Sequence, residues 1–253
     1  QIEALKKKPT VIVGSAPRVQ ELHRLGKLKL TGVKLLVLDE FDRLLGKQHL
    51  DEVRTVIRLL PAERQTLLLS ATAGMAAVRM AEELFAPRLI RVESTAASYE
   101  NYYHIVPFRD KIKAVQKLAR RLPVRRGLVF VGRSFDAAHA LEKLRFEGIK
   151  AVALLGQERR DQRRAALDAI RAGRAELLIS TDLAARGLDI EDVDYVIHLD
   201  LPEDVRTYRH RAGRTARAGK EGAVISLVDE KEMDKLKALA GRMEIELSRL
   251  PRA

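Results

Sequence analysis

Short apolar runs alternate with helical patterns along the chain, and this alternation restricts the folds that the sequence can adopt. The runs Val11–Val13, Leu35–Leu38 and Leu67–Leu69 are continuously apolar, which is typical of strands buried on both faces. The segments Gln48–Leu60 and Met75–Phe85 carry the spacing of helices. Because strands that alternate with helices form parallel sheets covered by helices, the sequence predicts an α/β fold.

The same alternation restarts in the second half of the chain. A small, polar and then aromatic stretch, Ser94–Tyr103 (STAASYENYY), separates the halves and carries no helical period. We therefore predict domains at residues 1–94 and 105–253, joined by a linker at residues 95–104, and 253 residues suit two domains. The other predicted strands are Leu89–Val92, Leu128–Val131, Ala151–Leu154, Leu177–Ser180, Tyr195–Leu199 and Ala223–Leu227. The other predicted helices are Phe135–Phe146, Arg160–Ala172, Val205–Arg211 and Glu230–Ala240.

The chain is basic, with 47 Lys and Arg residues against 35 Asp and Glu residues and a net charge of +12. Both halves share this excess, which suggests a polyanion that touches both, although a basic protein that is merely soluble has the same charge. Tryptophan is absent and aromatic residues make up only 4% of the chain. Contacts to a nucleic acid backbone are therefore favoured over base stacking.

Cysteine is absent, which excludes disulfides, thiolate zinc sites and a cysteine nucleophile. This usage fits a reducing cytoplasm, so a cytoplasmic location is expected. No apolar run approaches the roughly 20 residues that span a bilayer, so no membrane partner is expected. Nothing in the sequence suggests an obligate protein partner, and we expect a monomer.

Polar residues follow two of the predicted strands in the first half. Asp39-Glu40-Phe41-Asp42 comes directly after Leu35–Leu38, at the strand end where α/β proteins place their ligands. An Asp at this place can hold Mg²⁺ and a following Glu can orient a water molecule, although acidic residues after a strand also form ordinary turns. Ser70-Ala71-Thr72 follows the next strand and could relay hydrogen bonds or cap the following helix.

The second half carries a longer constellation. Ser180–Ile190 (STDLAARGLDI) combines polar groups at a strand end with a glycine and a second Asp. In His210–Gly219 (HRAGRTARAG), Arg211, Arg214 and Arg217 are spaced three residues apart, so they share roughly one surface. The planar, forked guanidinium group suits phosphate oxygens, and the interleaved glycine and histidine argue against a merely solvated basic patch.

Taken together, these motifs resemble those of a known family. DEFD, SAT, STDLAARGLD and HRAGRTAR, in this order and spacing, are similar to motifs II, III, V and VI of DEAD-box RNA helicases. Weaker matches support the resemblance, which covers nearly the whole chain. They are Val13–Arg18 (VGSAPR) for motif Ib, Leu128–Arg133 (LVFVGR) for motif IV, and Gly156–Arg163 for the QxxR region.

The resemblance implies a two-domain ATPase with RecA-like domains that bind ATP and RNA across a cleft. It implies that Asp39 holds Mg²⁺ through water and that Glu40 activates the hydrolytic water. An arginine finger is an arginine that reaches the transferred phosphoryl group, and it accelerates hydrolysis by about 10³–10⁵. Because it lies on the other domain, ATP hydrolysis would depend on closure of the two domains. The other residues implied for nucleotide contact are Gly187 and Asp189. The resemblance implies that Arg214 and Arg217 act as arginine fingers. The residues implied for coupling between the domains are Asp42, Ser70, Thr72 and His210.

The resemblance also implies RNA contacts, mostly to phosphate and sugar. Such contacts carry little sequence specificity, and discrimination of RNA from DNA would depend on 2′-hydroxyl groups. The residues implied for RNA binding are Arg18, Arg133, Arg163, Thr181, Asp182 and Arg186.

The sequence departs from the family pattern in one large respect and several small ones. No GxxxxGK[ST] phosphate loop and no adenine-reading Q motif occur in the 253 residues. We therefore expect a first domain truncated at its N-terminal side, with exposed strand edges and apolar faces, and little or no ATP turnover by this chain. Phe41 replaces the usual small residue of motif II, Pro17 removes an N–H group from motif Ib, and Arg160 replaces the usual Gln.

Three functions remain open from the sequence. The favoured one is an ATP-dependent RNA helicase core that remodels RNA duplexes or RNA–protein complexes by ATP-driven domain closure. The first alternative is a non-enzymatic RNA-binding module that retains the helicase fold. The second is a DNA helicase of the same broad superfamily. Retention of motifs II and VI together favours the enzyme, because a protein that never handled ATP has no use for them.

Overall fold

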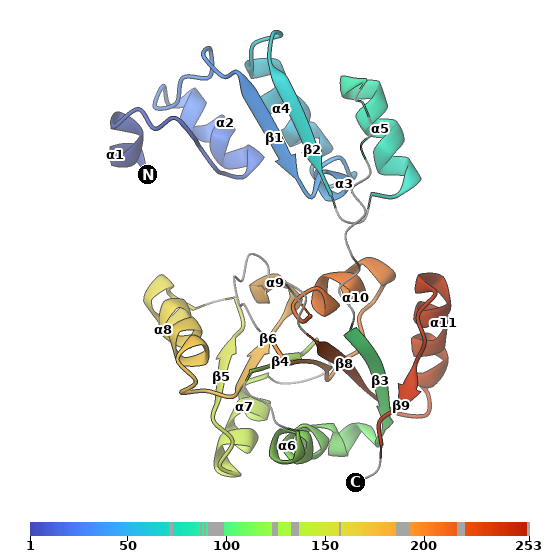
Figure 1. The fold of residues 1–253 in the computed structure, drawn as a ribbon. Helices are drawn as coiled ribbons and strands as arrows, with labels where there is room; N and C mark the ends of the chain where they lie inside the picture. Colours follow the sequence, from blue (N-terminus) through green and yellow to red (C-terminus); the bar gives the residue numbers. More distant parts are fainter. Residues whose placement is uncertain are drawn as a thin grey trace. The chain divides into compact units, whose positions relative to one another are not determined.

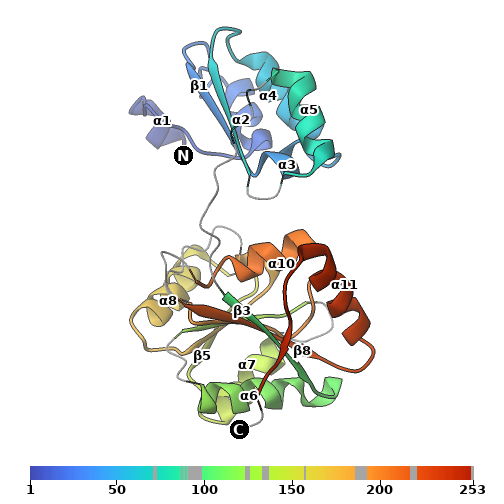
Figure 2. The ribbon, with the colours of Figure 1, turned by 45° about the vertical axis from the view of Figure 1, so that its right-hand side comes forward.

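The computed structural model divides the chain into two compact units, Gln1–Arg91 and Val92–Ala253, shown from two sides in Figures 1 and 2. The structure describes residues 1–70, 73–86, 88, 90, 99–122, 126–132, 137–156, 158–185, 193–216 and 221–251.

Unit 1 is built around a two-stranded parallel sheet. Strands β1 and β2 pair in register, with Leu35 opposite Gln65 and Asp39 opposite Leu69. Helices α4 and α5 lie against one face of this sheet (Figure 2). The helices of unit 1 are α1 (Ile2–Lys6), α2 (Ala16–Arg24), α3 (Phe41–Leu44), α4 (Leu50–Leu59) and α5 (Met75–Phe85), and its strands are β1 (Leu35–Asp39) and β2 (Gln65–Leu69). The helices predicted at residues 48–60 and 75–85 are thereby confirmed as α4 and α5.

The other face of the β1–β2 sheet is open within unit 1. Leu35 and Val37 of β1 are 49% and 45% exposed, and Leu67 and Leu69 of β2 are 40% and 50% exposed. The prediction that these strands are buried on both faces is therefore wrong for unit 1, because its helices cover only the face that carries Leu38. The exposed face agrees with the expectation of uncovered apolar surface.

The segment Val11–Val13 was expected to form a strand, and the structure shows that this prediction is wrong. The segment belongs to neither strand nor helix, and Val11 and Val13 are 76% and 94% exposed. A continuous apolar run becomes a strand only beside a partner that takes up its backbone hydrogen bonds, and none of the described strands of unit 1 pairs with it. The predicted strand Leu89–Val92 lies outside the described residues except for Ile90, which is in no strand.

Unit 2 contains a seven-stranded parallel sheet in the order β5-β6-β4-β7-β8-β3-β9. All residues of β4 and β6 are buried, which confirms the prediction of strands covered on both faces. The strands are β3 (Tyr99–Ile105), β4 (Gly127–Phe130), β5 (Ala151–Leu154), β6 (Leu177–Ser180), β7 (Tyr195–His198), β8 (Gly222–Val228) and β9 (Ser248–Arg249).

Helices cover both faces of this sheet (Figure 1). Helices α6 and α7 pack with the core on one face, and α8 to α11 pack with the core on the other. The helical segments are η1 (Phe108–Asp110), α6 (Lys111–Arg121), α7 (Ala137–Phe146), α8 (Arg160–Arg171), α9 (Asp182–Ala185), α10 (Val205–Ala212) and α11 (Met233–Met243). The predicted α/β class with helix-flanked parallel sheets is confirmed.

Strand β3 corrects the predicted linker. Residues Tyr99–Tyr103 were assigned to a segment without regular structure, yet they pair along β8 from Tyr99 opposite Gly222 to Ile105 opposite Val228. The short β9 pairs with β3 only at Tyr102 and Tyr103. Because β3 lies next to the end of the sheet, it tolerates the polar side chains that hid it among linker-like residues.

Gly222, at the start of β8, offers a test of packing in unit 2. A Cβ built on Gly222 would overlap Thr215 Oγ1 and lie 2.8 Å from the backbone nitrogen of Ala216. Because backbone cannot move as freely as a side-chain tip, we predict that Gly222→Ala lowers the free energy of unfolding by about 1–3 kcal/mol. Urea denaturation followed by circular dichroism measures the change.

Gly241 in α11 is the matched control, because a Cβ built there meets nothing within 4 Å. Gly241→Ala is expected to raise the free energy of unfolding by about 0.5–1 kcal/mol, since alanine favours a helix more than glycine does. Equal stability of the two variants would contradict this account of the β8 packing.

Candidate functional site

The acidic candidates of unit 1 lie at the carboxyl end of β1. Asp39 is the last residue of β1, and it pairs with Leu69, the residue before Ser70. Parallel register therefore brings Asp39 and Ser70 to the same edge of the sheet. The Oδ1 atom of Asp39 accepts a hydrogen bond of 2.9 Å from the backbone N–H group of Glu40, which leaves Oδ2 for a ligand.

Glu40 adopts a left-handed backbone conformation, with φ of 52° and ψ of 45°. Non-glycine residues seldom occupy this region, and such residues cluster at functional sites. Phe41 follows with 7% exposure and packs against Leu38, Leu45 and other core residues. The buried ring anchors the turn at a place where a small residue was expected, while the Asp39 and Glu40 side chains on the preceding residues remain exposed.

The carboxylate of Asp39 suits a magnesium ion whose other ligands are phosphate and water oxygens. Mg²⁺ is usually bound by one or two carboxylates together with phosphate and water oxygens. Within the described residues no group of three or more potential metal ligands occurs, so Asp39 would supply the protein's share. This donor set fits a nucleotide-bound Mg²⁺ better than a resident metal centre.

Two candidates of unit 2, Thr181 and Asp182, lie at the carboxyl end of β6, whereas Arg214 precedes Thr215, which bonds to residues before β7. Asp182 opens α9, one residue beyond the end of β6, and Arg211 lies in α10. Arg211 is 3% exposed and donates from Nε and Nη2 to the two carboxylate oxygens of Asp182, at 2.7 and 2.8 Å. Its Nη1 atom donates to the backbone carbonyl of Asp200 at 2.7 Å, and its Cζ atom lies 4.8 Å from the centre of the Phe130 ring.

Arg163 contacts the other end of the same short helix. Its Nη2 atom donates to the carbonyl of Ala184 in α9 at 3.0 Å. The hydroxyl oxygen of Thr181 accepts from the backbone N–H group of Ala184 at 3.3 Å. Three of the residues implied for RNA binding, Arg163, Thr181 and Asp182, therefore meet at α9.

Glu158 supports this edge from the loop before α8. Partial burial opposes its ionisation, but hydrogen bonds from the backbone N–H groups of Leu155 and Gly156 and the charge of Arg163 outweigh that effect. The pKa of Glu158 is therefore lowered, and the residue keeps its negative charge beside Arg163. Sequence reasoning did not single out Glu158, because a lone Glu in a polar loop carries no motif.

Helix α10, which carries His210, is anchored by buried rings. Tyr208 is fully buried and donates from its hydroxyl group to Oδ1 of Asn101 in β3 at 2.8 Å. His198 of β7 packs edge-on against the rings of Tyr208 and Phe130. Burial and the nearby charge of Arg211 hold the pKa of His198 well below its usual value, so the imidazole is neutral.

The structure does not describe every candidate. Arg18 lies on α2 and donates to Gln1 at 2.7 Å and to Glu21 at 2.6 Å, so acidic and amide groups already hold its guanidinium. Pro17 lies in the first turn of α2, where the helix makes no use of an N–H group. His210, Arg214 and Asp42 are half-buried. The candidates outside the described residues are Thr72, Arg133, Arg186, Gly187, Asp189 and Arg217.

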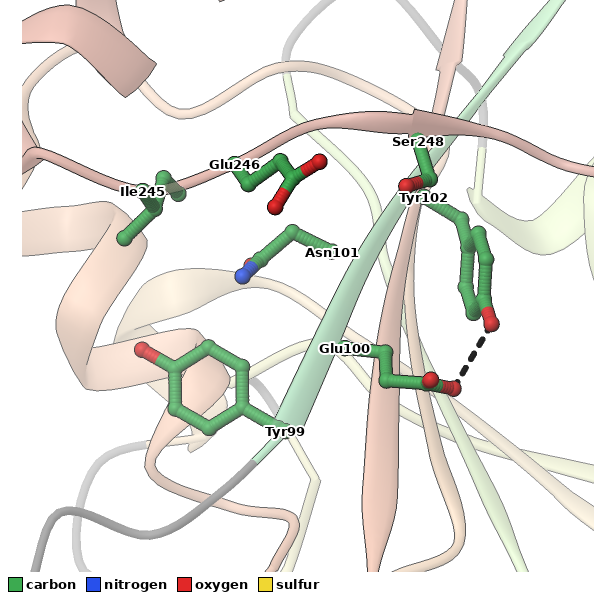
Figure 3. A pocket seen from close by; sticks show the side chains of 7 residues that line it. All are labelled: Tyr99, Glu100, Asn101, Tyr102, Ile245, Glu246 and Ser248. Carbon is green, nitrogen blue, oxygen red and sulfur yellow. Dashed lines mark hydrogen bonds between the residues drawn. The ribbon is translucent and has the colours of Figure 1, made fainter.

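A surface cavity of about 340 Å³ lies elsewhere in unit 2, between β3 and the segment that leads into β9. Figure 3 shows Tyr99, Asn101 and Glu246 around it, and a hydrogen bond of 2.6 Å from the Tyr102 hydroxyl to Glu100 beside it. None of the residues predicted for function lines this cavity.

Comparison with known proteins places both units in one family. The model of the DEAD/DEAH box helicase family matches residues 1–81, and that of the helicase conserved C-terminal domain matches residues 110–219. The chain is 41% identical to the DEAD-box ATP-dependent RNA helicase CshC of Bacillus cereus, over 97% of this chain and 64% of that protein. It is 40% identical to the probable ATP-dependent RNA helicase YfmL of Bacillus subtilis, over 98% of this chain and 66% of that protein.

Solved structures agree with these relatives. Dbp5 of S. cerevisiae bound to RNA and ADP BeF3 matches with a TM-score of 0.85 and 32% identity, over 95% of this chain and 65% of that chain. The C-terminal domain of the DEAD-box protein Dbp5 matches with a TM-score of 0.57 and 32% identity, over 62% of this chain and 92% of that chain. This chain thus spans slightly less than two thirds of the two bacterial relatives. The chain belongs to the DEAD-box helicase family.

Proposed function

We propose that these residues form most of the core of an ATP-dependent RNA helicase, which remodels RNA duplexes or RNA–protein complexes by ATP-driven closure of its two units. The observation that carries the proposal is the pairing of two constellations in family order. Asp39 and Glu40 stand at a strand end in unit 1, and in unit 2 α10 carries His210 and is followed by Arg214. Acidic and arginine-rich groups are the two halves that phosphoryl transfer requires.

Each group has a chemical role in this proposal. Asp39 would hold a nucleotide-bound Mg²⁺, because only its Oδ1 atom accepts from the backbone N–H group of Glu40. Glu40 accepts a proton from the attacking water, for which an exposed carboxylate at a turn is suited. Arg214 stabilises the charge that develops on the transferred phosphoryl group. The other proposed nucleotide, finger and coupling residues are Gly187, Asp189, Arg217, Asp42, Ser70, Thr72 and His210.

RNA binding is proposed for the edge of unit 2 around α9, with further contacts from α2. The net charge of +12 supports a polyanionic partner, and contacts to phosphate and sugar would read no sequence. Among the described residues no helix is long and apolar enough to cross a bilayer. We propose a cytoplasmic monomer, with RNA contacts at Arg18, Arg133, Arg163, Thr181, Asp182 and Arg186.

A second candidate function is an RNA-binding module that does not use ATP. One observation favours it, because the net charge of +12 is explained by binding of a polyanion alone. The two candidates differ in one measurable property. An enzyme core closes on RNA more tightly when ATP is bound, whereas a pure binding module ignores nucleotide.

Glu40→Gln tests the proposed general base. In a protein that joins these 253 residues to a phosphate loop, the substitution is expected to slow ATP hydrolysis by about 10²–10⁴, because the amide cannot accept the proton. A coupled assay of phosphate release in the presence of single-stranded RNA measures the rate. Glu63→Gln, an exposed residue in the turn before β2, is the control and should retain full turnover.

Normal turnover by Glu40→Gln would exclude the proposed role. RNA binding by the same variant should persist, since Glu40 carries no positive charge for phosphate. Loss of both ATP hydrolysis and RNA binding would indicate that unit 1 is misfolded, and not that a general base has been removed.

Arg214→Ala tests the proposed finger. We expect ATP hydrolysis in the same joined protein to fall by about 10³–10⁵, the contribution of an arginine that stabilises phosphoryl charge. Arg242→Ala, on the exposed side of α11, removes an equal charge and should leave turnover unchanged. Equal ATP turnover by Arg214→Ala and Arg242→Ala would show that Arg214 does not act on the transferred phosphoryl group.

Salt dependence tests the proposed RNA contact of Arg163. The logarithm of the RNA affinity should fall with the logarithm of salt concentration by about 0.7 per neutralised phosphate. Arg163→Ala should reduce this slope by about 0.7 if the side chain binds one phosphate. Fluorescence anisotropy with a labelled single-stranded RNA measures the slope, and a DNA strand of equal sequence serves as the comparison.

Tighter binding of DNA than of RNA would favour a DNA helicase. An unchanged slope in Arg163→Ala would place the phosphate contacts on other residues.

A further inference from the structure

Phe146 is the last residue of α7, and its side chain is 90% exposed. By comparison, Phe41 and Phe130 are 7% and 1% exposed, and Phe108 reaches only 43%. Aromatic side chains make up only 4% of the chain, and this one belongs to neither core cluster of unit 2. A single apolar side chain on a surface is common, so the groups around Phe146 decide what its ring can bind.

The end of α6 lies against the end of α7, beside Phe146. Arg120 of α6 donates from Nη2 to the backbone carbonyl of Glu147, the residue after Phe146, at 2.8 Å. Lys143 lies three residues before Phe146, which places the two side chains next to each other on α7. The ring therefore has cationic side chains near it on its own helix and on the neighbouring helix.

The exposed side of α6 continues this positive charge. Helix α6 (KIKAVQKLARR) contains no acidic residue. Lys113, Lys117 and Arg121 follow one another at intervals of four residues, so they lie along one side of the helix, and all three are exposed. The α6–α7 surface is defined by Lys113, Lys117, Arg120, Arg121, Lys143 and Phe146.

Most of the positive charge on the α6–α7 surface is available to a ligand. Arg120 has an acidic partner, since its Nη2 atom lies 3.4 Å from the carboxylate of Glu147. The four other cations of the surface have no hydrogen-bond or ion-pair partner among the residues that the structure describes. Glu142 is also exposed on α7, so the surface carries two carboxylates against five cations and has an excess of positive charge.

The α6–α7 surface is separate from the edge around α9. Helices α6 and α7 cover one face of the seven-stranded sheet, and α8 to α11 cover the other face (Figure 1). The RNA contacts proposed at Arg163, Thr181 and Asp182 belong to the elements of that other face. A ligand at Phe146 would therefore be bound by a different set of residues.

The chemistry of the α6–α7 surface suits a single-stranded nucleic acid. Proteins that bind single strands combine cationic groups, which hold phosphates, with aromatic rings on which bases stack. A protein partner fits less well, because lysine is depleted from the cores of protein interfaces and here it adjoins the ring. A second copy of this chain would bring the same positive charges to the contact.

We propose that the α6–α7 surface is a second contact for single-stranded RNA, in which the cationic side chains bind phosphates and Phe146 stacks on a base. This inference rests on the proposed function, because it requires that the chain binds RNA. It extends the RNA contact of unit 2 to the face of the sheet that carries α6 and α7. Stacking on a ring accepts any base, so this contact also reads no sequence.

A tryptophan at position 146 reports on the proposed stacking. Because the chain contains no tryptophan, Phe146→Trp introduces a single indole and keeps an aromatic ring at the surface. Stacking of a base on the indole quenches its fluorescence, so titration of the 253-residue variant with a single-stranded RNA of uniform sequence should give saturable quenching. Ala238→Trp, at an exposed position of α11, is the control and should keep its fluorescence.

Affinity and salt dependence test the ring and the cations separately. Phe146→Leu keeps an apolar side chain without a ring, and it should weaken RNA binding by about 5- to 150-fold, the contribution of one stacked base. Lys113→Gln combined with Lys117→Gln should reduce the salt slope by about 1.4, which corresponds to two phosphates. Lys235→Gln combined with Lys237→Gln, on the exposed side of α11, removes equal charge and should leave the slope unchanged.

Fluorescence anisotropy of a labelled RNA, measured in parallel, separates the contrary outcomes. Bound RNA without quenching in Phe146→Trp would overturn this inference and leave the proposed function standing, and so would equal salt slopes of the two double variants. A fluorescence change with protein concentration in the absence of RNA would overturn it in favour of contact between two copies. A chain that binds no RNA at all would overturn the proposed function, and this inference with it.

Discussion

The buried guanidinium of Arg211 is the interaction on which the functional edge of unit 2 depends. Moving a charge out of water costs several kcal/mol, and the cost is offset only when every donor finds a partner in good geometry. The partners here are a carboxylate, a backbone carbonyl and an aromatic face, each from a different segment. Arg211 therefore joins α10 to α9 and to the ends of β4, β6 and β7.

The pKa values of a histidine and a glutamate in this part of unit 2 are both lowered, with opposite effects on their charge. His198 lies among Phe130 and Tyr208 and near Arg211, and its low pKa keeps a second positive charge out of the core. Glu158 shows the opposite case, since its lowered pKa keeps a negative charge beside Arg163. Arg211 and Arg163 therefore each have an anionic partner, while the imidazole of His198 near Arg211 stays uncharged.

Much of the fold could be predicted from the sequence, and the failures have physical causes. Continuous apolar runs marked β4 to β8 correctly, because these strands are covered by helices on both faces. The same signal misled at Val11–Val13, since a run of apolar residues says nothing about whether a pairing strand is present. Strand β3 was missed because its polar residues resemble a linker, and its place near the end of the sheet tolerates them.

The candidate site shows the same limits. The rule that ligands bind at carboxyl ends of parallel strands located Asp39, Glu40 and Ser70 on one edge. The left-handed turn at Glu40 had no local signal, because this conformation is usually marked by glycine and a glutamate gives no such mark. The ion pair of Asp182 and Arg211 joins residues on different elements, and no spacing pattern records such a contact.

The topology of unit 2 has a consequence for how the protein is made. Strand β3 is the first strand of its sheet to leave the ribosome, yet the neighbour that pairs with its full length, β8, is encoded roughly 120 residues later. At ordinary speeds of protein synthesis that interval lasts about 6–25 s. During that time Tyr99, Tyr102 and Tyr103 have no sheet to join, so the nascent chain carries an exposed aromatic segment. This interval is when a chaperone would have the most to bind.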